Sequence, residues 1–196
     1  MALTRLGLNQ SINLATNITG TLATGNGGTG ATSYTAGISV AEEWVLTSNK
    51  TSAGDITANL SLSSFAGVGA INASMSESSG VFTFPSTGIW FIGFNGLIEE
   101  GSQSSNVAIV RPEIKITTDN SSYNICARSQ EGIAGTIAAE FSGTSTTSFL
   151  FDVTNTTTHK CKFAVANLEN NNRLLGSGGA SNLQHTKFTF LRLGDT

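Results

Sequence analysis

The sequence predicts an all-β protein, and two observations carry that prediction. First, short runs of residues alternate between apolar and polar side chains, which is the period of a half-buried strand. In residues 55–63, DITANLSLS, this alternation would place Ile56, Ala58, Leu60 and Leu62 on one face. Second, no segment carries an apolar stripe at helical spacing over three turns. This excludes a βαβ architecture and leaves a sandwich, a jelly roll or a barrel.

Other runs with the same alternation are expected to form strands, because turn residues such as Gly, Pro and Asn separate them. These runs are residues 43–48, 71–75, 81–84, 89–98, 110–118, 123–129, 137–141, 148–154, 160–168 and 187–193. Strands that recur at such short intervals are typical of a single β domain with two packed sheets.

The run at residues 89–98, IWFIGFNGLI, differs from the others because it is apolar on both faces. A strand in a two-layer sandwich normally shows one face to water. The second face of this strand is therefore expected to be covered. Another subunit and a long loop of the same chain are the two candidates for that cover.

The composition limits the classes of partner. Only 12% of the 196 residues are charged and the formal net charge is −3, with Lys and Arg scattered along the chain. Nucleic acid is therefore an unexpected partner, since it requires clustered positive charge. No apolar stretch is long enough to span a membrane, and the first residues lack the apolar core of a signal peptide. We expect no membrane insertion, and assembly in a cytoplasm.

The first part of the chain has a different texture from the rest. Residues 14–37 consist almost entirely of Gly, Thr, Ala and Asn, and alternating runs begin near Val40. We therefore divide the chain into an extended N-terminal arm, residues 1–39, and a β domain, residues 40–196. Ordering an arm so rich in Gly costs a large amount of backbone conformational entropy. Intermolecular contacts are therefore expected to hold it. The residues expected to anchor it are Leu14, Ile18, Leu22, Gly25, Gly27, Gly28 and Gly30.

Within that arm, Gly25, Gly27 and Gly30 match the spacing G-x-G-x-x-G. A dinucleotide site with this spacing needs a buried strand before the glycines and a helix after them. The residues before are too polar for such a strand, and no helix is readable in TSYTAG, which follows. The match is interpreted as a consequence of composition, and no nucleotide cofactor is expected.

Cysteine and histidine give no catalytic pattern. Cys126 and Cys161 are far apart in the sequence and are expected to be buried free thiols, with a cross-strand disulfide as the alternative. His159 and His185 each lie beside a Lys in a polar segment and are expected at the surface. No G-x-S-x-G motif accompanies them, so a serine hydrolase is not indicated.

Carboxylates are equally uninformative. Glu42 and Glu43 are neighbours, as are Glu99 and Glu100, and neighbours on a strand point to opposite faces. Neither pair forms a two-carboxylate glycosidase site. No oxygen-rich loop or zinc spacing occurs either, so we predict no metal, no required cofactor and no enzymatic activity.

The segment GVFTFPSTGIWFIGFNGLI, residues 80–98, resembles the signature of the C1q and tumour-necrosis-factor superfamily. The matching residues are Gly80, Phe82, Phe84, Pro85, Gly88, Trp90, Phe91 and Phe94. The end of the chain is similar to the end of the same domain, with alternating aromatics at Phe188 and Phe190 in its last strand.

This resemblance covers roughly Val40 to Leu193. It implies a ten-stranded jelly roll that assembles as a compact homotrimer with aromatic residues along the threefold axis. Trp90, Phe94, Phe188 and Phe190 are the residues expected at that trimer interface.

The arm resembles something separate. Residues 14–32 are similar to low-complexity segments that precede trimeric knobs in bacteriophage tail-fibre and appendage proteins. The residues that carry this resemblance are Gly20, Thr21, Leu22, Asn26, Gly27, Gly28, Thr29, Gly30, Ala31 and Thr32.

Together the two resemblances imply a virion protein: a trimeric fibre or appendage whose arm binds other tail or capsid proteins. Its knob would face the host and bind a surface glycan or protein. One alternative is a capsid decoration protein that stabilises the shell. A second alternative is a carbohydrate-binding or carbohydrate-cleaving domain.

Overall fold

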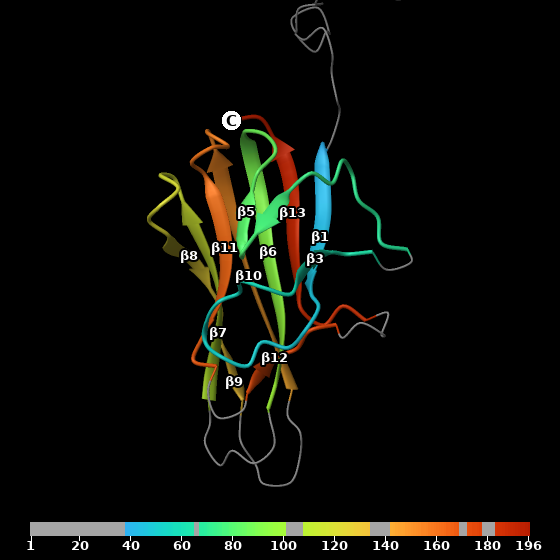
Figure 1. The fold of residues 1–196 in the computed structure, drawn as a ribbon, viewed down its shortest axis with the longest axis vertical. Helices are drawn as coiled ribbons and strands as arrows, with labels where there is room; N and C mark the ends of the chain where they lie inside the picture. The colour runs from blue at the N-terminus through green and yellow to red at the C-terminus, as the bar shows by residue number, and fades with distance from the viewer. Residues whose placement is uncertain (1–37, 65–66, 101–107, 134–141, 169–171, 178–182) are drawn as a thin grey trace, which may run out of the picture. The chain divides into compact units, whose positions relative to one another are not determined.

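The computed structural model describes residues 38–64, 67–100, 108–133, 142–168, 172–177 and 183–196. These residues contain strands and no helix, and they form two antiparallel sheets that face each other (Figure 1). The all-β prediction is therefore confirmed. The N-terminal arm, with its seven predicted anchoring residues, lies outside the described residues, so its boundary and its role stay predictions.

The first sheet, sheet A, has the strand order β10-β6-β13-β1-β3, and β12 pairs with the end of β6. The bounds of its strands are β1 Val40–Leu46, β3 Leu60–Leu62, β6 Gly88–Glu99, β10 Ser142–Val153, β12 Arg173–Leu174 and β13 Lys187–Gly194. The two long strands β6 and β10 pair over their whole length, from Ser142 opposite Glu99 to Val153 opposite Gly88. The strand β6 therefore sits inside the sheet, with hydrogen-bonded neighbours on both sides.

The second sheet, sheet B, has the strand order β4-β5-β11-β7-β8, with β2 paired to β11 and β9 paired to β7. The bounds of its strands are β2 Gly54–Asp55, β4 Ser76–Ser78, β5 Val81–Thr83, β7 Ala108–Thr117, β8 Asn124–Arg128, β9 Glu131–Ile133 and β11 Lys160–Ala166. The central strand β11 contributes Cys161, Phe163 and Val165 to the core.

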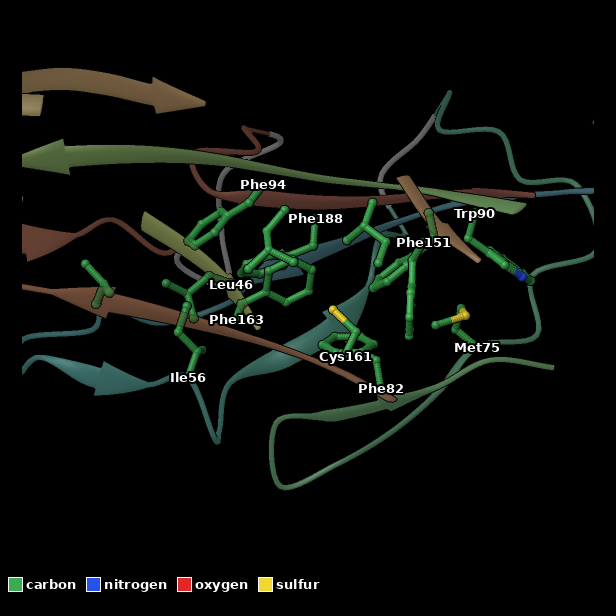
Figure 2. Packing of buried hydrophobic residues seen from close by; sticks show 14 of the residues in the cluster. Leu46, Ile56, Met75, Phe82, Trp90, Phe94, Phe151, Cys161, Phe163 and Phe188 are labelled. Carbon is green, nitrogen blue, oxygen red and sulfur yellow. The ribbon is translucent and has the colours of Figure 1, made fainter. Parts of the chain in front are cut away.

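Aromatic side chains from both sheets fill the space between them. Phe163 of β11 contacts Phe94 of β6 and Phe188 of β13, with ring centroids 5.4 and 4.4 Å apart (Figure 2). Phe82 of β5 lies 5.0 Å from Phe190 of β13. Edge-to-face and tilted pairs of this kind add to the hydrophobic stabilisation that burial provides. Ring contacts thus join the two sheets, together with the aliphatic side chains of the same buried cluster.

This core corrects the expectation for the trimer interface. Trp90, Phe94, Phe188 and Phe190 all point inward, and each has 0% of its surface exposed in the single chain. A side chain with no exposed surface has none left to bury against a partner. The expectation was wrong because the sequence pattern defines two faces of a strand but not which of them meets the second sheet.

Two glycines of the superfamily resemblance have clear structural reasons. Gly80 has a φ of 83°, and a Cβ there would lie 2.2 Å from the carbonyl oxygen of Ile56. Gly88 has a φ of 138°, and a Cβ there would lie 2.4 Å from the carbonyl oxygen of Gly194. Only glycine combines this backbone conformation with so close an approach of another segment.

The predicted strand at residues 55–63 is not continuous. It divides into β2 and β3, separated by a loop in which Asn59 has a φ of 61°. Ile56 is buried as expected, but Ala58 and Leu62 are exposed. The run at residues 71–75 is likewise reduced to a single bridge at Ile71, before β4. The predicted run at residues 137–141 lies entirely outside the described residues.

Candidate interaction surface

The outward face of sheet A carries a continuous row of apolar side chains. Register places Leu150 of β10 opposite Phe91 of β6, and Phe91 opposite Leu191 of β13. Leu191 lies opposite Ala41 of β1, which bridges to Ile71. Directly opposed residues of antiparallel strands share one face, so these five side chains form one line across the sheet. We call them the apolar row.

The apolar row is accessible to solvent in the single chain. Leu150 is 59% exposed and Ile71 is 47% exposed, while Phe91, Leu191 and Ala41 are half-buried. Polar side chains flank the row on this face: Thr189 and the Glu43–Lys187 ion pair lie on one side of it, and Asp152 follows Leu150 on β10. A contiguous apolar patch bordered by polar side chains is typical of an interaction surface.

The sequence contained a signal for this surface. The apolar residues on both faces of the run 89–98 predicted that its second face would be covered, and β6 does alternate between buried and half-buried positions. The residues now assigned to the outward face, Phe91, Leu150 and Leu191, were missed because β6 and β13 both have aromatic or aliphatic residues on their two faces.

The outward face of sheet B is charged instead. The Asp55 carboxylate accepts a hydrogen bond from Lys115 at 2.7 Å and lies 3.6 Å from the Lys162 ammonium. Lys162 also lies over the ring of Tyr123, 4.1 Å from its centroid. Burial raises the pKa of Asp55, but the two ammonium groups outweigh it and hold the pKa below its ordinary value.

A second ion pair extends this charged face. The Glu113 carboxylate accepts a hydrogen bond from Arg128 at 2.8 Å and is almost completely buried beneath it. Opposite charges on neighbouring strands satisfy one another in this way. The charged side chains on the outward face of sheet B therefore pair with one another within the chain.

The two cysteines are free thiols, as expected. They lie on β8 and β11, which both pair with β7 and therefore flank it. Strands separated by a third strand are about 9–10 Å apart, which exceeds the reach of a disulfide. Burial raises the pKa of Cys126 to about 11 and holds the pKa of Cys161 well above its ordinary value. Neither thiol has the character of a catalytic nucleophile.

One of the two histidines differs from expectation. His159 is buried, stacks on Phe151 with ring centroids 5.5 Å apart, and lies between the hydroxyl groups of Thr154 and Thr158. The hairpin between β10 and β11 folds its own loop over the ring, which the polar sequence around His159 did not indicate. His185 is half-buried, with Nδ1 3.2 Å from the carbonyl oxygen of Gly176.

In the part of the chain that the structure describes, no group of three or more His, Cys, Asp or Glu side chains is arranged to hold a metal ion. No helix among the same residues is long and apolar enough to cross a membrane. Glu99 forms an ion pair with Arg173 across the pairing of β6 and β12. Glu43 pairs with Lys187 at 3.1 Å across β1 and β13. These carboxylates have structural partners.

Comparison with solved structures identifies the fold. The chain is similar to murine APRIL crystallised at pH 5.0, with a TM-score of 0.54 and 10% sequence identity, over 79% of this chain and 98% of that one. The pH 8.5 structure of murine APRIL gives a TM-score of 0.51 and 8% identity over the same shares. The fold is a TNF-like jelly roll.

No family model matches the sequence, and no curated protein matches it. At this level of identity the likeness to the solved structures shows the fold alone. The jelly-roll part of the superfamily expectation is therefore confirmed.

Proposed function

We propose that this chain is a structural subunit of a bacteriophage virion that assembles as a homotrimer. Residues 1–39 attach it to other proteins of the particle, and residues 40–196 form a jelly-roll knob that is exposed for host attachment. Its role is assembly and adhesion. The observation that carries the assembly part is the apolar row on the outward face of sheet A.

The apolar row supports self-association for an energetic reason. A partner that covered the row would stabilise the assembly by about 25 cal/mol for each Å² of apolar surface removed from water. The row crosses β10, β6, β13 and β1, so a second chain laid on this face would contact a rigid, hydrogen-bonded platform. Three identical chains that each cover a neighbour's row would form a closed, symmetric assembly.

The virion part of the proposal rests on the resemblance of residues 14–32 to segments of phage appendages. An arm of small residues gains order from backbone contacts with a larger partner, because it has few side chains to form a core of its own. A fibre subunit needs such an attachment segment at one end and an exposed domain at the other. The proposal assigns these two tasks to the arm and the jelly roll.

Sedimentation equilibrium of the full chain at micromolar concentration tests the assembly part. Wild-type protein is expected to sediment as a trimer, and Phe91→Glu is expected to sediment as a monomer because it places a charge in the centre of the apolar row. The matched control is Ile125→Glu, which adds the same charge at an exposed apolar residue of β8 in sheet B. A monomeric wild-type chain, or equal dissociation of both variants, would contradict the proposal.

The copy number of the protein in purified particles tests the virion part. A few tens of copies or fewer indicates an appendage, whereas hundreds indicate a capsid decoration protein. Particles that lack the protein are expected to lose adsorption to the host. Normal adsorption combined with heat-sensitive shells would replace the fibre function with the decoration function.

A further inference from the structure

Buried oxygen atoms without hydrogen-bond partners gather at one end of the sandwich. Glu100 directly follows β6 and is only 4% exposed. Neither of its carboxylate oxygens has a hydrogen-bond partner among the described residues. Asn172 directly precedes β12 and is 2% exposed, and its Oδ1 also has no partner in that part of the chain. Three buried acceptor atoms therefore lack a donor, which is costly in a folded protein.

The pairing of β6 with β12 brings these two side chains to the same side of sheet A. Arg173 lies opposite Glu99, and the two form an ion pair on the outward side. Because the strands are antiparallel, the next step of the same ladder brings Asn172 opposite Glu100. Successive side chains of a strand point to opposite faces, so both residues point inward. Their burial agrees with this direction.

A second carboxylate reaches the inside of the sandwich from sheet B. Glu131 of β9 lies opposite Val110 of β7, which is completely buried. Directly opposed residues share one face, so Glu131 also points inward. A Cβ at Gly143 of β10 would lie 2.7 Å from Oε1 of Glu131. The Glu131 carboxylate therefore lies against the inner face of sheet A, where Gly143 leaves room for it.

Register places the two carboxylates near each other. Gly143 pairs with Ile98, and Glu100 is the next inward-facing residue after Ile98. Two residues of a strand span about 7 Å, a separation that two Glu side chains can close. The strands β9 and β12 both lie at the lower end of the molecule in Figure 1. Neither Glu100 nor Glu131 forms an ion pair with any residue that the structure describes.

A cation satisfies this group of oxygens better than a proton does. An ionised carboxylate that is buried without a partner destabilises a fold, so it takes up a proton or a positive partner. Glu100 and Asn172 form no hydrogen bond with each other, so a proton on Glu100 would not be shared with the amide oxygen. One cation can bind oxygens from all three side chains. Carboxylate and amide oxygens are the ligands that hard divalent cations prefer.

We propose that Glu100, Asn172 and Glu131 bind one calcium ion between the two sheets. Calcium accepts oxygen ligands in irregular geometry, whereas magnesium requires a nearly ideal octahedron, which three separate segments provide less readily. Two carboxylates and one amide do not form a group of three or more His, Cys, Asp or Glu side chains, and no such group occurs in the described residues. The sequence-based expectation of no metal overlooked these ligands because they match no spacing motif. The ion would tie sheet A to sheet B within a single chain.

Thermal unfolding of the full chain in calcium chloride and in EDTA tests this site. A Kd of about 0.1–1 mM is expected for a site with two carboxylates. About 10 mM calcium is then expected to raise Tm by about 3–10 °C over its value in EDTA, with sodium chloride added to equal ionic strength. Isothermal titration calorimetry with calcium chloride is expected to show one site per chain. An unchanged Tm together with no binding heat would overturn the proposal.

The decisive variant is Glu100→Gln, which keeps the size of the side chain and removes its charge. It is expected to raise Tm in EDTA, where the carboxylate has no partner, and to lose most of the calcium response. Glu131→Gln is expected to weaken calcium binding about tenfold. The matched control is Glu99→Gln, which removes the same charge from the outward side of the same segment and is expected to respond to calcium as wild type does. A full calcium response in Glu100→Gln, or equal loss of the response in Glu99→Gln, would overturn the proposal.

Discussion

The outward faces of the two sheets differ, although the same aromatic core supports both. Sheet A shows the apolar row, in which Phe91 and Leu191 lie directly opposite one another. Sheet B shows an ion-paired network, in which Asp55 joins Lys115 and Lys162. Register puts each set on the side away from the core. The sandwich therefore has one face suited to water and one face suited to a cover.

The two faces illustrate two ways in which the outward side chains of a sheet are stabilised. On sheet B the charged groups find partners within the chain, so that face is complete without another molecule. On sheet A the side chains of the apolar row cannot form ion pairs. Only a second surface packed against them can remove them from water. An exposed apolar face of this kind is a liability unless the chain assembles.

The largest expected effect distinguishes the two faces of β6. Phe94→Ala is expected to lower the free energy of unfolding by about 3–5 kcal/mol, because it empties a completely buried site. Phe91→Ala is expected to cost each chain only about 1 kcal/mol but to weaken assembly. Urea unfolding at two chain concentrations measures both, since only an assembly defect depends on concentration. If Phe94→Ala proved the concentration-dependent variant, the assignment of the two faces would be reversed.

A smaller effect concerns a carboxylate on the inward side of sheet A. Burial raises the pKa of Glu42, and the hydrogen bond from the Met75 N–H at 2.7 Å lowers it only in part. The folded chain therefore holds this proton more tightly than the unfolded chain does. Its stability falls as the pH rises from about 4.5 through the raised pKa.

Glu42→Gln is accordingly expected to raise the free energy of unfolding by about 1 kcal/mol at pH 7, since it removes a buried charge. Little change is expected at pH 3, well below the unfolded value of 4.5, where the wild-type carboxyl is protonated in both states. Thermal unfolding at the two pH values measures this difference. Destabilisation at pH 7 would show that the charge on Glu42 is favourable.

The smallest effect concerns the ion-paired face of sheet B. Because the folded pKa of Asp55 is lowered, its contribution is present above the unfolded value of 3.8 and is lost as the pH falls through the folded pKa. Asp55→Asn is expected to cost about 0.5–1 kcal/mol at pH 7 and less at pH 3, as for a partly exposed pair. Thermal unfolding in low and high salt provides the check, because salt is expected to shrink the difference. An equal cost at both pH values would indicate a packing effect in place of an electrostatic one.

Several elements of the fold could be predicted from the sequence. The runs that became β5, β7, β8, β11 and β13 alternate and end at turn residues, and the continuous apolar run at residues 89–98 became β6, so local chemistry determined these strands. Gly80 and Gly88 were also recognisable from the resemblance, and the structure gives each a close backbone approach. Positions with a strict local requirement are the ones that a sequence pattern reveals best.

The run at residues 55–63 shows where that reasoning stops. Its alternation is as regular as that of β5, yet the chain turns at Asn59 and uses only its two ends as strands. Ile56 is drawn into the core, and its N–H pairs with the Phe163 carbonyl on β11. The middle of the run, residues 57–59, is exposed and lies outside both sheets. The contact with a distant strand decided this outcome, and no local pattern records such a contact.

The sequence by itself determined the class of the protein, the positions of most strands and the fact that β6 would have two apolar faces. Only the tertiary structure decided which of these faces is inside. Side chains on a strand alternate with a period of 2, so both assignments fit the same string of residues. Pairing of β6 with β10 and β13, and the contact of Phe94 with Phe163 across the sandwich, chose one of them. That choice placed Trp90, Phe94, Phe188 and Phe190 in the core and left Phe91, Leu150 and Leu191 on the outward face of sheet A.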